Sequence, residues 1–446
     1  MADPPIPDPD EIFGNREQSR GALIVHRRII LCCDGTWNDR ETNDPFTNVT
    51  KFISCLDSVD DRGKERQYEQ IPIYLDGIGT GTTLSGSLYE GATGKSISRK
   101  LREAYKNLCA LCVDEEDQIV LIGFSRGAYT VQCLARLLYD VGLIENSWVN
   151  RELPKDTVGS LKSSLIGESL KSSLISGYQK PFSFVGDQLP PNVEQAYHAL
   201  ALDEKRKDFK PTLLTSIRKN QLRQCWFLGS HGDVGGGNVN SGLSKISFCW
   251  MISRLEAGVR FKELAIWNDT AEGAPLKTIP SRHHTGVKNI IGAEKYNSFA
   301  GWRLRGKHIR QVGKSGIKGK DNPYGNSNET IHYTVRYFDE IADPNTRTLP
   351  EPLKTRKFQY SQFNKNLPDT VPWKWEGTVD GQPTMVREDR GSDYERGMLQ
   401  RWIDDDPTAW GALASALKDL KSITFNGPIT IPLSPTPGVV PLGAIA

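Results

Sequence analysis

The sequence predicts an α/β fold in which a mostly parallel central sheet carries helices on both of its faces. Short apolar runs, typical of buried strands, alternate along the chain with longer segments of helical periodicity. Strands that alternate with helices are joined by crossovers, which make neighbouring strands parallel. The predicted strands are residues 28–33, 72–75, 119–122, 224–228 and 329–338. The predicted helices are residues 48–56, 96–111, 128–139, 194–206 and 243–255.

The composition is that of an ordinary globular protein. The chain has 446 residues, 37% hydrophobic and 25% charged, with a formal net charge of +2. This balance predicts no nucleic-acid partner. No run of 18 apolar residues occurs, and residues 1–26 are proline-rich without an apolar core. We therefore expect a disordered lead and a cytoplasmic protein, with neither signal peptide nor membrane span. The eight cysteines show no metal-ligand spacing and favour a reducing compartment.

The sequence predicts three regions, of which the first is the lead at residues 1–26. Residues 27–340 form the catalytic domain, within which 145–190 is irregular. This irregular part repeats SLKSSLIGE as SLKSSLISG at 160–177, and it is either a flap over the site or a flexible insertion. From 341 onward proline, charge and tryptophan dominate. Residues 341–446 are thus expected to be a peripheral extension, with one helix at 392–403 and a C-terminal tail.

The first candidate site is the sequence Gly-Phe-Ser-Arg-Gly at residues 123–127. A predicted strand precedes it and a predicted helix follows it. In such a turn, glycines flank a serine because a Cβ at either position would collide with the adjoining strand or helix. The context predicts that Ser125 is a nucleophile, and the alternative is a simple strand-to-helix turn. Phe124 is expected to line the substrate site.

A second candidate site follows the predicted strand 224–228. Residues 229–237 contain His231, Asp233 and five glycines. Ligands of open α/β sheets bind at the carboxyl ends of the strands, so this loop is expected beside Ser125. The order serine, acid, histidine is met by Asp233 followed by His332.

Other histidines follow Asp233 and remain alternatives for the base. They are His283, His284 and His308. His231 precedes its possible acid and is expected to line the site instead. His198 is expected to be a structural residue on a helix.

Two further loops follow predicted strands. Asp34, Gly35 and Thr36 lie after the first strand, and the N–H of Gly35 or Thr36 is a candidate oxyanion donor together with that of Arg126. Alternatively, Asp34 and Thr36 cap the next helix. Asp34 and Asp76 are also expected to line the substrate site.

The glycine-rich loop at 76–82 lacks the ending of a P-loop and the spacing of a dinucleotide site, so no nucleotide is expected there. The serine chemistry requires neither a metal nor an organic cofactor. We therefore predict none.

Seven motifs in order resemble the DUF2235 family. They are CDGTWN (33–38), TNV (47–49), YLDGIGTG (74–81), GFSRGAYT (123–130), HALALDEKR (198–206), WFLGSHGDVGGG (226–237) and IHYTVRY (331–337). The set is similar to the fungal branch, which is related to the catalytic domain of type VI secretion phospholipase effectors. The resemblance covers residues 27–338.

The resemblance implies an α/β-hydrolase that cleaves carboxylic esters, in particular phospholipid acyl esters, with a Ser-Asp-His triad. By motif position the triad is Ser125, Asp233 and His332. A lipid substrate implies transient membrane contact through residues 145–180, and the oligomeric state is not predicted.

The chain departs from the family in one segment. The family has a strand that ends in Trp-Asp-Thr-Val-Gly-Ser, whereas residues 155–160 read Lys-Asp-Thr-Val-Gly-Ser after a segment that is not strand-like. Asp156 is therefore an alternative acid. This departure also favours the second function considered, a catalytically impaired hydrolase-fold protein that acts in binding or interaction.

Overall fold

The structure is a computed structural model that describes most of the predicted core. The described residues are 25–35, 46–63, 66–77, 94–144, 185–218, 220–238, 242–262, 265–266, 307–313, 327–341, 349–362, 373–405 and 440–445.

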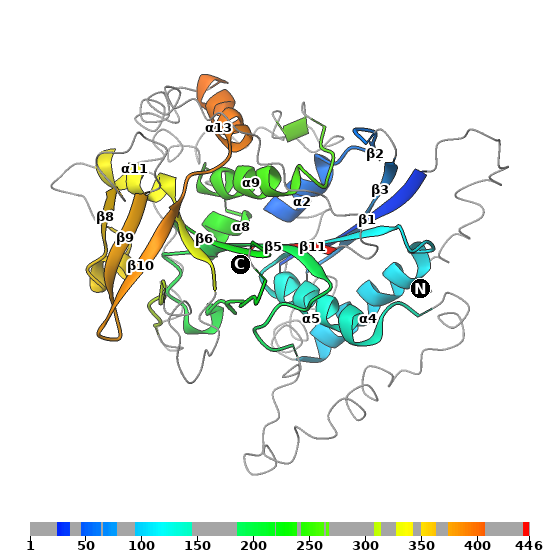
Figure 1. The fold of residues 1–446 in the computed structure, drawn as a ribbon, viewed down its shortest axis with the longest axis horizontal. Coiled ribbons are helices and arrows are strands. Elements are labelled where there is room, and N and C mark those ends of the chain that lie inside the picture. The colour runs from blue at the N-terminus through cyan, green and yellow to red at the C-terminus, as the bar shows by residue number, and fades with distance from the viewer. Residues whose placement is uncertain are drawn as a thin grey trace, which may run out of the picture.

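Within these residues, one sheet of eleven strands runs through the molecule in the order β2-β3-β1-β4-β11-β5-β6-β7-β10-β9-β8 (Figure 1). Neighbouring strands from β3 to β10 are parallel, and the antiparallel pairings lie at the two edges. The strands are β1 Val25–Cys33, β2 Val59–Asp60, β3 Gln67–Leu75, β4 Gln118–Phe124, β5 Val193–Ala201, β6 Leu222–Phe227, β7 Glu329–His332, β8 Gln359–Gln362, β9 Trp373–Val379, β10 Gln382–Asp389 and β11 Val440–Ile445.

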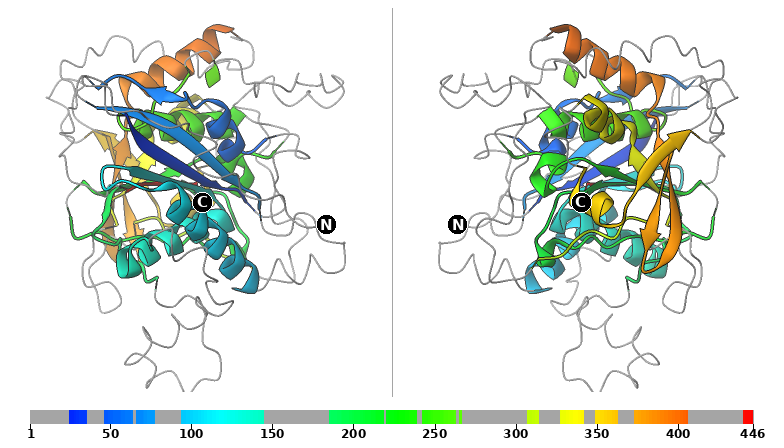
Figure 2. Two further views of the ribbon diagram at one scale, coloured as in Figure 1. Left: turned by 90° about the vertical axis from the view of Figure 1, so that its right-hand side faces the viewer. Right: turned by 90° about the vertical axis from the view of Figure 1, so that its left-hand side faces the viewer.

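Helices cover both faces of this sheet. Figure 2 shows α4 and α5 on one face and α2 and α9 on the other. The helices are α2 Asn48–Ser54, α4 Gly94–Leu111, α5 Arg126–Val141, α8 His231–Gly235, α9 Gly242–Leu255, α11 Tyr333–Ile341, α12 Glu351–Thr355 and α13 Asp393–Asp405, with a 3-10 helix η2 at Lys207–Phe209. The predicted mixed α/β class with a mostly parallel sheet is confirmed.

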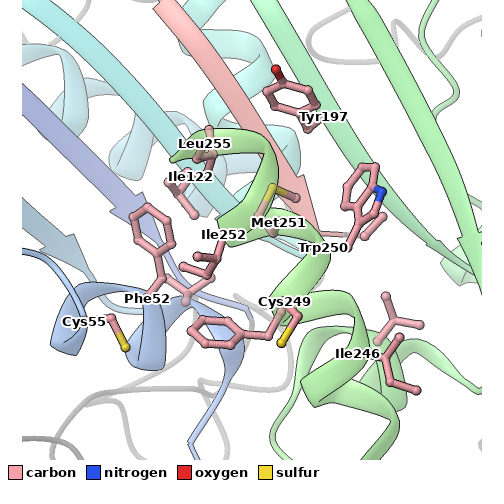
Figure 3. Close-up of a cluster of buried hydrophobic side chains, with 14 of the residues drawn as sticks. Phe52, Cys55, Ile122, Tyr197, Ile246, Cys249, Trp250, Met251, Ile252 and Leu255 are labelled. Atoms are coloured by element: carbon pink, nitrogen blue, oxygen red, sulfur yellow. The ribbon is translucent and has the colours of Figure 1, made fainter. Parts of the chain in front are cut away.

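A separate hydrophobic layer fills each side of the sheet. In the layer under α2 and α9, Phe52, Ile122 and Trp250 are all at most 1% exposed (Figure 3). The layer under α4 and α5 is built from residues such as Leu108 and Leu134. Burying one side chain of this size stabilises the fold by about 1.5–3 kcal/mol. Because α9 has buried residues on all sides, it must lie inside the molecule.

Most predicted elements are confirmed with small shifts at their ends. The strand predicted at 28–33 is β1, and the helix predicted at 48–56 is α2. The helix predicted at 392–403 is α13. Short apolar runs thus gave the strands of the core, since a strand buried on both faces has little room for polar residues.

The helix predicted at 194–206 is wrong, because most of this segment forms β5. Its alanine, leucine and glutamate residues favour a helix locally. All residues from Ala196 to Ala201 are buried, however, and β5 pairs in parallel with both β11 and β6. Tertiary packing therefore overrides the local preference.

The strand predicted at 329–338 is only half correct. Strand β7 ends at His332, and helix α11 begins at Tyr333. The alternation of apolar and polar residues continues past His332, so the sequence gave no sign of the change.

The C-terminal segment was predicted to be a tail, and this is wrong for Val440–Ile445. These residues form β11 in the centre of the sheet, between β4 and β5. The register shifts between Val440 and Pro441, where proline has no N–H to give to the ladder. The strands β8, β9 and β10 also extend the same sheet, so the sheet crosses the boundary expected at residue 340.

A proline in β11 is expected to destabilise the whole protein. Ala444 pairs with Gly123 on one side and His198 on the other. Ala444→Pro removes a ladder N–H from a central strand and leaves a buried acceptor unpaired, which should cost about 1–3 kcal/mol. Thermal unfolding measures the loss, with Ala444→Ser as the control that keeps the N–H. Equal melting temperatures for the proline variant and the wild type would refute the central position of β11.

Candidate functional site

Ser125 occupies a strained turn between β4 and α5. Its backbone has φ 56° and ψ −123°, in a region that residues with a Cβ rarely adopt. A Cβ at Gly123 would lie 2.6 Å from the backbone of Ala128, and one at Gly127 would lie 2.2 Å from the carbonyl oxygen of Cys33. The predicted strand–turn–helix context is confirmed, and both flanking positions require glycine.

The Ser125 hydroxyl is half-buried, and no described residue hydrogen-bonds to it. It stands at the carboxyl end of β4 and at the N-terminus of α5. Arg126 is the first residue of α5, so its N–H has no partner within the helix. The positive end of the helix dipole favours negative charge at this position. A negatively charged oxygen near Ser125 would therefore be stabilised.

Asp34 lies at the end of β1 and is committed to four donors. Its carboxylate accepts hydrogen bonds from the hydroxyls of Thr47 at 2.7 Å, Thr50 at 3.1 Å and Tyr74 at 2.8 Å. The Gly35 N–H donates to the same carboxylate at 2.6 Å. Burial raises the pKa of Asp34 even though these hydrogen bonds act in the opposite direction.

These contacts bear on the two interpretations of the turn after β1, which are an oxyanion hole and a helix cap. The Gly35 N–H is already used, and Thr36 lies outside the described residues. The N-cap of α2 is Thr47, whose side chain accepts from the Thr50 N–H. Asp34 therefore holds the start of α2 through two threonine hydroxyls rather than by capping the helix directly.

The glycine-rich loop after β6 packs against the residue that precedes Ser125. A Cβ on Gly235 would lie 1.9 Å from the Phe124 ring, and the His231 ring stacks on Phe124 with centroids 4.8 Å apart. The expectation that this loop lies beside the serine turn is confirmed by these two contacts. His231 is half-buried, and burial lowers its pKa to about 4, so its imidazole is neutral at pH 7.

Asp233 is buried in this loop and holds the start of α8. Its Oδ2 accepts hydrogen bonds from the N–H and the hydroxyl of Ser230 at 2.8 and 2.9 Å. Its Oδ1 accepts from Asn238 at 2.8 Å. Both carboxylate oxygens thus have partners within the loop, and none of these partners is a histidine.

His332 is the last residue of β7 and is fully buried. Its Nε2 donates to Glu395 of α13 at 2.7 Å, and the Thr334 hydroxyl lies 2.8 Å from its Nδ1. The ring also packs on Phe227, with centroids 4.6 Å apart. The structure therefore places His332 in a network that does not include Asp233.

Ser125 and His332 are also far apart across the sheet. Four strand-to-strand steps separate β4 from β7, through β11, β5 and β6. At about 4.8 Å for each step the separation is about 19 Å. The structure does not bring the three predicted triad residues together.

Glu395 is the partner of His332 that sequence reasoning missed. Ser392 and Glu395 form a capping box, in which Ser392 Oγ accepts from the Glu395 N–H at 3.0 Å and Glu395 accepts from the Ser392 N–H at 3.3 Å. The Ser-x-x-Glu spacing was readable as a helix start. Nothing in the sequence indicated that this helix would return to β7.

The remaining predicted site residues are either structural or not described. His198 lies on β5 instead of a helix, is buried, and has its Nδ1 3.1 Å from Gln224 Oε1, with a pKa lowered by burial to about 4. Burial and nearby cations lower the pKa of His308, whose backbone N–H donates to the Lys205 carbonyl oxygen in the loop after β5. Asp76 is exposed just after β3. His283, His284, Asp156, Thr36 and the repeat at 160–177 lie outside the described residues.

Neither a metal centre nor a membrane span is present in the described part of the chain. No three His, Cys, Asp or Glu side chains there are grouped as metal ligands. No helix in it is long and apolar enough to cross a membrane.

Comparison with known proteins gives one family match and two relatives. The family model described as "T6SS, Phospholipase effector Tle1-like, catalytic domain" matches residues 27–153 and 155–254. The uncharacterized protein YEL023C of Saccharomyces cerevisiae is 26% identical over 236 residues, which are 43% of this chain and 33% of the yeast protein. A solved structure of the Tle1 effector bound to the VgrG spike is 18% identical, with a TM-score of 0.32, over 52% of this chain and 57% of that chain. The matches thus span less than two thirds of either relative.

Removing the Glu395 carboxylate is expected to destabilise the protein strongly. Glu395→Ala leaves the buried His332 without its partner, and breaking a buried pair in this way costs about 3–5 kcal/mol. Asp393→Ala is the matched control, since Asp393 is exposed on the same helix and should change stability by only about 0–1 kcal/mol. Denaturant unfolding compares the two variants. Equal midpoints would contradict the buried contact.

Proposed function

Because this chain belongs to the family of Tle1-like phospholipase effector catalytic domains of type VI secretion, we propose that it is a serine hydrolase that cleaves the acyl esters of lipids. The proposed fold is α/β-hydrolase-like, with Ser125 as the nucleophile. Membrane contact through residues 145–180 stays a prediction, since this segment lies outside the described residues.

The observation that carries the proposal is the backbone of Ser125. A serine at φ 56° costs about 1–3 kcal/mol and persists only where the surrounding structure enforces it. Here the enforcement comes from the two glycine contacts described above. A simple strand-to-helix turn has no need of such strain. A nucleophile does, because the strain projects its hydroxyl away from both elements.

The chemistry follows from the position of Ser125. After loss of its proton, Oγ attacks the ester carbonyl carbon and the alcohol leaves, so that an acyl-enzyme forms. Water then releases the fatty acid. The negative charge on the carbonyl oxygen is held by the Arg126 N–H at the start of α5. Since the Gly35 N–H is bonded to Asp34, the N–H of Thr36 is the proposed second donor.

The triad of Ser125, Asp233 and His332 stays a prediction. Its support is the motif order, because Asp233 and His332 occupy separate hydrogen-bond networks in the structure. Among the described histidines, His231 has its ring against Phe124, next to the nucleophile. This contact supports a role for His231 in lining the substrate site.

The separation of Asp233 from His332 also favours the rival function. A hydrolase-fold protein with an incomplete triad would bind a lipid or a protein without turning it over. In that case Ser125 would not be activated and would not react with serine-directed probes. Probe reactivity therefore distinguishes the two functions directly.

We expect Ser125 to be the residue that reacts with a fluorophosphonate probe and supports ester turnover. Ser125→Ala should abolish labelling and lower kcat on a p-nitrophenyl ester by a factor of about 10⁴ or more, because the nucleophile is lost. Ser253→Ala is the control, since its hydroxyl bonds only to the Trp250 carbonyl oxygen on α9. A folded wild type that is neither labelled nor active would establish the rival function.

Substitution of the acid tests the triad itself. If Asp233 acts as the triad acid, Asp233→Asn lowers kcat about 10⁴-fold, because a triad carboxylate fixes the tautomer and charge of the base. If Asp233 only holds the start of α8, turnover persists. Loss of its capping role alone would cost only about 0.5–2 kcal/mol of stability. Asp156→Asn is measured in parallel, with melting temperatures for both. Loss of turnover in Asp156→Asn alone would transfer the role to Asp156.

A further inference from the structure

Arg310 is a buried cation that the proposed chemistry does not use. It is 2% exposed, and its Nη2 donates to the Phe209 carbonyl oxygen at 2.6 Å. Its Nη1 is buried and has no hydrogen-bond partner among the described residues. Leaving such a donor unpaired costs about 1–3 kcal/mol, and more when the group is charged. A ligand with an acceptor oxygen would satisfy this donor.

His231, which also contacts Phe209, offers a second unpaired nitrogen. Its ring lies between Phe124, stacked at 4.8 Å, and Phe209, edge-on at 5.1 Å. Its Nε2 is shielded from solvent and finds no partner in the described part of the chain. Phe209 thus contacts both Arg310 and His231. The His231 ring also contacts Phe124, the residue before Ser125.

The charges around this site do not cancel. The Glu204 carboxylate accepts hydrogen bonds from two nitrogens of Arg206, at 2.9 and 2.8 Å, and from the backbone N–H of His231 at 3.2 Å. The Arg206 guanidinium stacks 3.4 Å over the Phe209 ring. Glu204 therefore pairs with Arg206, and it also acts on the more distant Arg310, whose pKa it raises against the effect of burial.

The surroundings keep Arg310 charged and the region positive. Burial lowers the pKa of Arg310 to about 10, so the guanidinium remains protonated at pH 7. After burial, the causes that lower the pKa of His308 are the cations Arg310, Lys210, Arg356 and Lys207. These cations approach the same corner of the molecule, at the carboxyl end of β5. An anion would be attracted there.

We propose that Arg310 and His231 form a subsite for the phosphate group of a phospholipid beside Ser125. The inference rests on the proposed ester hydrolysis and specifies its substrate. Nη1 of Arg310 donates to one phosphate oxygen, and the Nε2–H tautomer of neutral His231 donates to another. A phosphodiester carries one negative charge, which matches the single positive charge of Arg310.

The geometry favours phosphate over a water molecule or a neutral head group. A water cannot neutralise a buried guanidinium, whereas a phosphate oxygen forms a charge-assisted hydrogen bond with it. In a phospholipid the acyl esters and the phosphate share one glycerol unit. A phosphate held by His231, whose ring stacks on the residue before Ser125, would bring an acyl carbonyl near the nucleophile.

The test compares two substrates that differ only in the phosphate-containing head group. We measure kcat/KM on monomeric dihexanoyl phosphatidylcholine and on dihexanoylglycerol for the full chain. In Arg310→Gln the ratio of the first to the second should fall about 10- to 100-fold, the range of one hydrogen bond to a charged group. The loss should lie mainly in KM, because the phosphate is bound equally in the ground and transition states.

Arg66→Gln is the matched control. Arg66 is exposed just before β3, at the opposite end of the strands, and pairs with Glu116. We expect it to leave the ratio unchanged. An unchanged ratio in Arg310→Gln, or an equal loss on both substrates, would overturn the phosphate subsite while ester hydrolysis stands. If Arg310→Gln does not fold, Arg310→Lys keeps the charge without the forked donors and should lower the ratio about ten-fold.

A binding measurement separates the subsite from the reaction. Calorimetric titration with glycerol 3-phosphate should show binding to the wild type that weakens at least about ten-fold in Arg310→Gln. If the wild type hydrolyses neither ester but binds in this way, the hydrolase proposal fails and the subsite stands. Inorganic phosphate is titrated in parallel. Tighter binding of inorganic phosphate than of glycerol 3-phosphate would assign the subsite to free phosphate and refute the lipid head group.

Discussion

The close approach of α5 to the end of β1 is the constraint on which the site depends. A Cβ on Gly127 would lie 2.2 Å from the Cys33 carbonyl oxygen and 2.5 Å from that of Asp34. The helix can therefore begin only directly beside β1, and the chain must turn within one residue of the end of β4. Ser125 takes a positive φ because no relaxed turn fits this space. The burial of β4 and α5 against the rest of the core offsets this strain.

The same constraint connects three loops that are distant in the sequence. Asp34 holds Thr47 at the start of α2, and Thr47 forms a bridge with Gly236 of the loop that follows β6. The Gly237 N–H donates to the Phe46 carbonyl oxygen at 3.2 Å. Gly235 leaves only enough room for the Phe124 ring. The serine turn, the turn after β1 and the glycine loop thus form one connected assembly, which is why His231 has a fixed position beside the nucleophile.

The sequence was sufficient to predict the parts of this assembly that depend on local chemistry. The glycines around Ser125 and the buried runs of β1, β4 and β6 could be predicted, because each reports a backbone or burial requirement of its own position. The identity of β5 could not, because its helix-favouring residues are overruled by strands on both sides. The place of β11 was equally hidden, since Pro441 and Gly443 disfavour a strand locally. The Glu395 contact joins residues 63 positions apart, and only the folded chain brings them together.

The described residues after 340 contribute buried ion pairs to the core as well as strands to the sheet. Asp389 of β10 accepts hydrogen bonds from Arg254 at 2.7 Å and from Trp250 Nε1 at 3.1 Å, both on α9. Burial alone would raise the pKa of Asp389, but Arg254 and the other partners outweigh it and hold the pKa below 3.8. The resulting stabilisation is complete above that ordinary value and is lost only as the pH falls through the lower folded-state value. Arg254 without Asp389, or His332 without Glu395, would leave a buried polar group unpaired. The described strands β8 to β11 and helix α13 therefore contribute to the same sheet and interior as residues 27–340.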